Sequence, residues 1–102
     1  EAKVALIPAW PDYVFAEDYA LMPLAEKEKY VQENRHLPGV PTAAEVAENG
    51  LPLGQTQLAV TQNLEEVYLH LFEMEKRLEA LEASNKRLEA ENAALKAQIE
   101  KH

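Results

Sequence analysis

The sequence predicts a mainly α-helical chain, in which a small head packs on a long C-terminal helix and that helix forms a parallel homo-oligomeric coiled coil. Two observations predict it. All six prolines and all three glycines lie between Pro8 and Gly54, so the rest of the chain contains neither helix breaker. Apolar residues then recur with a period of 3.5, which is typical of left-handed coiled coils. We therefore divide the chain into a compact head, residues 1–54, and a coiled-coil helix, residues 55–102.

The predicted helix carries an apolar seam at two positions of each heptad, a and d. A helix of about 70 Å, at 1.5 Å per residue, would leave this stripe in water if it stayed alone. Charged residues beside the seam favour parallel, in-register chains, because Arg77 can meet Glu82 of a neighbour and Glu91 can meet Lys96. Position a holds Leu64, Leu71, Leu78, Asn85, Asn92 and Ile99, and position d holds Val60, Val67, Met74, Leu81, Leu88 and Leu95.

Two of the a positions are polar, and they bear on the number of chains. A buried asparagine lowers the stability of a coiled coil but fixes its register, and in two-stranded coils it favours the dimer. Trimers also tolerate asparagine layers when water or an anion fills the axis. From the seam alone, Asn85 and Asn92 therefore slightly favour a dimer.

Near the start of the helix the apolar pattern is wider than a seam, because Tyr68, Leu69 and Phe72 join the a and d residues. A helix that is apolar on most sides is buried on most sides. We therefore expect the head, from the same chain or a neighbour, to pack on the outside of the coil.

The head contains short local signals for one β segment and two helices. Val4–Ile7 is β-prone and is closed by Pro8. Pro23 can open a helix that Pro38 stops. A second helix begins at the capping box of Thr42 and Glu45 and ends at Gly50, which suits a left-handed residue. So small a head has too little core to be stable alone, and we expect oligomerisation to stabilise it.

The head also holds a cluster of aromatic residues, which we expect to dock it on the helix. They are Trp10, Tyr13, Phe15 and Tyr19, and their predicted partners on the helix are Tyr68 and Phe72. A chain of this size needs its large side chains in the core, so packing is the favoured interpretation. The alternative is that the rings stack on sugars at an exposed surface.

Composition and motifs exclude several functions. The net charge of −8 argues against a nucleic-acid partner, and no apolar run is long enough for membrane insertion. The chain has no cysteine and no metal-binding histidine spacing, so we predict no metal and no cofactor. We expect His36 to cap a helix end or to bond a carbonyl group, and His70, at position g, to meet Glu75 of another chain. Acidic pairs such as Glu65–Glu66 are interpreted as solvated, so we predict that the protein is not an enzyme.

An ordered set of motifs resembles a C-terminal module of large secreted tail-fibre-like and adhesin-like bacterial proteins, notably of Bacteroidota. The motifs are the string Trp10–Phe15, then Asp18, Tyr19 and Leu21, then Asn34, His36, Leu37, Pro38 and Pro41, then Glu45, Val46 and Gly50–Gly54, and finally Leu64, Glu65, Glu66 and Leu69. The resemblance runs from about Val4 to Phe72. It implies an extracellular or cell-surface location and an upstream fibre shaft in the same chain.

By its position the module is comparable to the intramolecular chaperone domains of fibres, which implies a trimer and outweighs the asparagine signal for a dimer. Self-cleaving chaperones of that kind use a serine nucleophile. The only serine here is Ser84, in the predicted stalk, so cleavage by that route is not supported. We therefore predict a trimerisation and assembly module, and the alternative is a fibre-tip module that recognises a glycan or a protein receptor.

Overall fold

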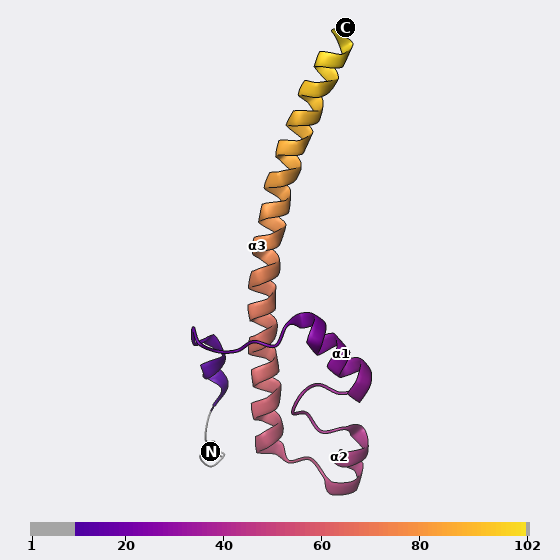
Figure 1. Ribbon diagram of the computed structural model, residues 1–102. Helices are drawn as coiled ribbons and strands as arrows, with labels where there is room; N and C mark the ends of the chain where they lie inside the picture. The colour runs from indigo at the N-terminus through magenta and orange to yellow at the C-terminus, as the bar shows by residue number, and fades with distance from the viewer. Residues whose placement is uncertain (1–9, 102) are drawn as a thin grey trace. The chain divides into compact units, whose positions relative to one another are not determined.

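The computed structural model describes residues 10–101, and in this range the chain is mainly helical (Figure 1). A short 3-10 helix, η1 (Pro11–Phe15), is followed by α1 (Leu24–Asn34), α2 (Ala43–Asn49) and α3 (Leu53–Glu100). The mainly helical fold with a long C-terminal helix is thus as predicted. Residues 10–101 contain no strand, and the β segment predicted at Val4–Ile7 lies outside the described residues.

Helix α3 begins at Leu53, close to the predicted start at residue 55, and continues without a break to Glu100. The chain divides into two compact units within this helix, between His70 and Leu71. The predicted division lay at residues 54 and 55. The first part of α3 belongs with the head because, as shown below, the head packs on it.

Helix α1 begins where the sequence predicts it, directly after Pro23. Pro23 precedes its first residue with a φ of −56°, close to the value that a helix requires. The helix ends at Arg35, whose φ of 61° lies in the left-handed region and whose N–H donates to Val31 O at 2.7 Å. A left-handed residue ends the helical hydrogen-bond ladder, so the last residue of α1 is Asn34, four residues before Pro38.

Helix α2 has the capping box that the sequence predicts. Glu45 N–H donates to Thr42 Oγ1, and Thr42 N–H donates to Glu45 Oε1, each at 3.1 Å. The helix closes at Gly50, whose N–H donates to Val46 O. Gly50 has the predicted positive φ, 77°, but its ψ of 175° lies outside the left-handed helical region. That combination is essentially restricted to glycine.

The aromatic string at the start of the described residues forms η1. A 3-10 helix has three residues per turn, so residues three apart lie on one face. Pro11 and Val14 form such a pair and both are buried. Trp10 and Phe15 remain 44% and 51% exposed, so these rings are not the core of the head within a single chain.

The buried core of the single chain is therefore very small. Val14, at 1% exposure, is the only hydrophobic residue that is buried in the part of the chain that the structure describes. Domains of this size usually bury more than half of the surface that their unfolded chain exposes. Many large apolar side chains of residues 10–101 remain 37–74% exposed.

Candidate functional site

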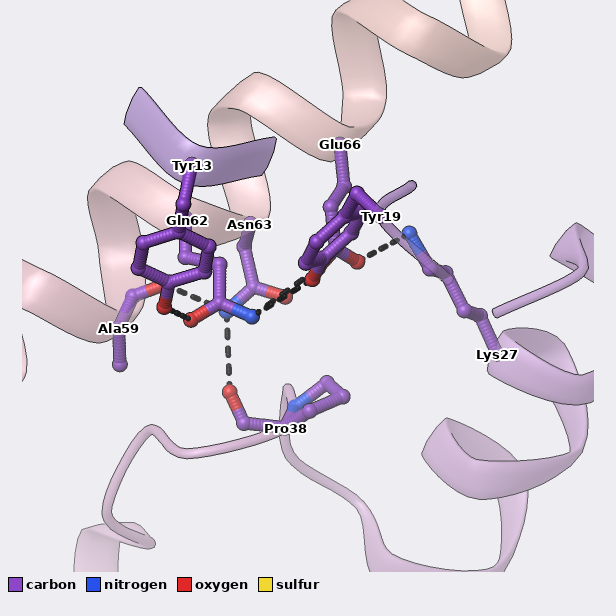
Figure 2. Close-up of polar contacts among 8 residues, drawn as sticks. All are labelled: Tyr13, Tyr19, Lys27, Pro38, Ala59, Gln62, Asn63 and Glu66. Atoms are coloured by element: carbon purple, nitrogen blue, oxygen red, sulfur yellow. Dashed lines mark hydrogen bonds and ion pairs between the residues drawn. The ribbon is translucent and has the colours of Figure 1, made fainter. Parts of the chain in front are cut away.

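The head is held on α3 by a cluster of polar side chains centred on Glu66 (Figure 2). The Tyr19 hydroxyl donates to Glu66 Oε2 at 2.5 Å, and Lys27 Nζ lies 2.6 Å from Glu66 Oε1. Gln62 Nε2 donates to the same Oε2 at 3.1 Å and to the Tyr19 hydroxyl at 3.0 Å. Gln62 Oε1 also accepts from the Tyr13 hydroxyl at 2.7 Å. We call Tyr13, Tyr19, Lys27, Gln62 and Glu66 the polar cluster.

Glu66 is the residue on which sequence analysis was most clearly wrong. It was interpreted as part of a solvated acidic pair, but it is only 8% exposed. Burial opposes its negative charge, yet the hydrogen bonds from Lys27, Tyr19 and Gln62 and the charge of Lys27 outweigh burial. The pKa of Glu66 is therefore lowered below the usual carboxyl value. The available signal was the set of polar residues near the start of α3, facing a tyrosine-rich head.

The pKa of Tyr19 is shifted in the opposite direction to that of Glu66. Burial and then the hydrogen bond to the Glu66 carboxylate raise the pKa of Tyr19 to about 12, because a second negative charge beside Glu66 is unfavourable. Its ring also lies against that of Tyr13, with a centroid distance of 5.9 Å and a tilt of 44°. The prediction that Tyr13 and Tyr19 dock the head on α3 agrees with these contacts.

A second contact fixes the turn between α1 and α2 on α3. Asn63 Nδ2 donates to Pro38 O at 3.0 Å and to Ala59 O at 2.8 Å. Gly39 has a φ of 75°, and a Cβ atom built there would lie 3.2 Å from Ala59 Cβ. The turn therefore approaches the helix closely, at a position where only glycine fits without strain.

A third contact joins η1 to α3 through two acidic residues. Glu65 Oε1 is buried and has no hydrogen-bond donor among the described residues. Burial, and then the neighbouring carboxyl group of Asp12, raise the pKa of Glu65. This pair disfavours the charged form of Glu65, so it opposes the docking that the polar cluster stabilises.

These contacts all lie on one side of α3. Each residue advances about 100° around a helix, so heptad positions b, f, c and g are neighbours around the axis. Glu65 occupies b, Gln62 occupies f, Ala59 and Glu66 occupy c, and Asn63 occupies g. The described part of the head thus packs on this arc of α3. At positions a, d and e, Val60, Leu64, Val67 and Tyr68 are 43–54% exposed.

The predicted seam is therefore exposed along the described helix. Its apolar members keep 43–74% of their surface exposed, from Val60 to Ile99, and Asn85 and Asn92 are also exposed. Tyr68 and Phe72, which were predicted to dock the head, are half exposed. We call Val60, Leu64, Val67, Leu71, Met74, Leu78, Leu81, Asn85, Leu88, Asn92, Leu95 and Ile99 the exposed seam.

The two histidines of the described residues behave differently from each other. His36 Nδ1 lies 2.8 Å from Leu37 O and its ring meets Tyr30 edge to face, so the prediction that it bonds a carbonyl group is confirmed. His70 was expected to face Glu75 of another chain, but it is only 6% exposed and its Nε2 is buried without a hydrogen-bond partner among residues 10–101. Its place at position g puts it at the edge of the arc that the head covers, which accounts for the difference.

Among residues 10–101, no three His, Cys, Asp or Glu side chains are grouped so that they could hold a metal ion. None of the helices in this range is both long and apolar enough to cross a membrane.

Comparison with protein-family models, curated proteins and solved structures finds no match to this chain.

Proposed function

We propose that this chain is a non-enzymatic homo-oligomerisation module, in which the exposed seam of α3 pairs with the same seam of identical chains in a parallel coiled coil. The observation that carries the proposal is the arrangement of the head. It packs on one side of the first part of α3, and the apolar a and d side chains from Val60 to Ile99 are 43–74% exposed. A helix with such a stripe is stable in water only when another apolar surface covers it.

The energy available from this pairing is large compared with the core of the single chain. Burying a leucine, isoleucine or valine side chain fully contributes about 1.5–3 kcal/mol. Ten apolar seam residues are about half exposed, so covering them contributes on the order of 10 kcal/mol per chain. This is several times the contribution of Val14, the one buried hydrophobic residue among residues 10–101.

The number of chains is proposed to be three. The resemblance to the C-terminal modules of bacterial fibres and adhesins supports a trimer, whereas Asn85 and Asn92 support a dimer. We favour the trimer because the asparagine preference is only a tendency. A module at the end of a fibre would then join three chains before the shaft assembles, which raises their effective concentration to roughly the millimolar range.

Light scattering behind a sizing column tests this proposal over a range of chain concentrations. A mass about three times the chain mass of 11.5 kDa would support the trimer. A mass about twice that value would favour a dimerisation module and weaken the comparison with fibre chaperones. A monomer at every concentration, with α3 still helical by circular dichroism, would contradict the proposed function.

A second function is favoured by one observation. Trp10 and Phe15 are half exposed on η1 rather than buried, and exposed aromatic rings can stack on sugars or on a receptor protein. On this alternative the head is the binding module of a fibre tip and α3 is its spacer. A glycan array with the wild-type protein and the Trp10→Ala variant separates the two. Reproducible binding that Trp10→Ala removes, with helicity unchanged, would favour recognition.

A further inference from the structure

An apolar groove runs along the edge of the exposed seam in the head unit. It has a volume of about 700 Å³ and lies between α1 and the first part of α3. Its outer wall is formed by Leu24 and Val31 of α1 and by Leu37 after it. These three side chains are 37–52% exposed, so the wall is available to another molecule.

The residues of α3 that line the groove occupy the heptad positions that accept a side chain of the neighbouring helix in a parallel coiled coil. It includes Val60, Asn63, Leu64 and Val67, which occupy d, g, a and d of the heptad. In parallel coiled coils an a side chain of one helix inserts between four such residues of the next. The groove therefore includes the first three residues of the exposed seam, with α1 as an additional wall beyond position g.

The position of that additional wall determines which residue of a second copy reaches it. In a parallel, in-register coil an e residue faces the g residue five positions earlier in the neighbouring helix. Tyr68 is an e residue, and the g residue five positions earlier is Asn63, in the wall of the groove. The Tyr68 ring is half exposed, and position e lies outside the arc formed by b, f, c and g.

We propose that the groove between α1 and α3 is the seat of a second copy of this chain, and that Tyr68 of that copy packs against Leu24, Val31 and Leu37. This inference rests on the proposed coiled coil and adds to it. The head would then be part of the interface, because the groove of each chain would hold Tyr68 of its neighbour. We call this contact the clasp. A second copy is the occupant because the groove is continuous with the exposed seam and has the same heptad register.

The clasp would also connect the polar cluster with assembly. Lys27 lines the groove and at the same time binds Glu66 at 2.6 Å. Asn63 lines it and anchors the turn at Pro38. The contacts that hold α1 on α3 therefore also hold the outer wall in place, and only a docked head presents the complete groove.

Photo-cross-linking tests the proposal. A benzoylphenylalanine residue replaces Tyr68, and isotopically light and heavy chains are mixed, denatured and refolded together before irradiation. The expected result is cross-linked peptides that join residue 68 of one isotopic form to residues 24–37 of the other. Cross-links that join residue 68 only to residues of its own chain, or only to α3 of another chain, would overturn the clasp.

A pair of matched variants gives a second measurement. Val31→Asp places a charge in the outer wall, and Ala25→Asp places the same charge on α1 at an exposed position that does not line the groove. We expect Val31→Asp to raise the midpoint concentration of dissociation by about tenfold or more, and Ala25→Asp to leave it unchanged. Equal midpoints in both variants, with helicity retained, would contradict the clasp.

The two experiments separate this inference from the proposed function. If the wild type is monomeric by light scattering, the coiled coil itself is wrong. If it is oligomeric but shows no cross-link to residues 24–37 and no effect of Val31→Asp, the coiled coil stands and the clasp is wrong.

Discussion

The Tyr19 hydroxyl donates a 2.5 Å hydrogen bond to Oε2 of Glu66, across 47 positions of sequence. Tyr19 lies in the head and Glu66 lies on α3, so this bond fixes which side of the helix the head covers. The side it leaves uncovered carries the exposed seam. The predictions below test the docking of the head, its dependence on pH and the role of the seam.

Removal of the Tyr19 hydroxyl tests the first contact. Tyr19→Phe keeps the ring beside Tyr13 but leaves the Glu66 carboxylate with one donor fewer. We expect the free energy of unfolding to fall by about 1–2 kcal/mol, since hydrogen bonds to charged groups contribute more than neutral ones. Chemical denaturation at one fixed chain concentration measures it. Tyr30→Phe, in the head but outside the polar cluster, is the control, and an equal loss in both would contradict the role of the hydroxyl.

The lowered pKa of Glu66 predicts a loss of stability in acid. A carboxyl group whose pKa is lowered on folding stabilises the folded state above its ordinary value, 4.5, and this contribution is lost as the pH falls through the folded value. Glu66→Gln removes the charge at every pH. We therefore expect a lower melting temperature than wild type at pH 7 and a much smaller difference at pH 3. A difference of the same size at both pH values would contradict the electrostatic explanation.

Glu65, the adjacent residue, should behave in the opposite way. Its pKa is raised by burial and by Asp12, so its contribution to stability is fully present below 4.5 and is lost as the pH rises through the raised value. Glu65→Gln should consequently raise the melting temperature at pH 7 and change it little at pH 3. The two substitutions are chemically identical and adjacent, so each serves as the control for the other. A fall at pH 7 in both variants would contradict the repulsion between Glu65 and Asp12.

Two glycine substitutions should have opposite effects on stability. Gly39→Ala places a Cβ atom 3.2 Å from Ala59 Cβ, on a residue with a φ of 75°. We expect a loss of about 1–2 kcal/mol from this strained backbone. Gly54→Ala meets nothing within 4 Å and lies in the first turn of α3, so it should stabilise the protein by up to about 1 kcal/mol. Thermal unfolding at equal concentration measures both, and a stabilising Gly39→Ala would show that the turn does not pack closely on α3.

Charges in the exposed seam should abolish assembly. Leu71→Asp combined with Leu78→Asp places two carboxylates in a surface that the coiled coil would bury, and unpaired buried charges are strongly unfavourable. We expect monomers with a disordered head. Ala80→Asp combined with Ala83→Asp adds the same charge at positions c and f, outside the seam, and should keep the wild-type mass. Light scattering and circular dichroism distinguish the two, and a seam variant that kept its mass and helicity would contradict the proposed function.

The sequence by itself determined the local elements of this protein. Pro23, the capping box of Thr42 and Glu45, and the run without proline or glycine after Gly54 act over a few residues. The starts of α1 and α2 and the end of α2 were therefore predictable from local hydrogen bonding and backbone geometry, whereas α1 ends at the left-handed Arg35 and not at Pro38. The heptad period is also local, since it repeats along one helix, so the seam was found without knowledge of the fold.

Only the tertiary structure decided which side of α3 the head covers and which side chains are buried. Glu66 was predicted to face solvent and His70 to face another chain, yet both are buried, whereas Trp10 and Phe15 stay about half exposed in the single chain. The burial of Glu66 depends on Tyr19 and Lys27, which meet it across 47 and 39 positions of sequence. No local pattern encodes such a pairing, because it exists only after the head has docked and its donors have replaced water around the carboxylate.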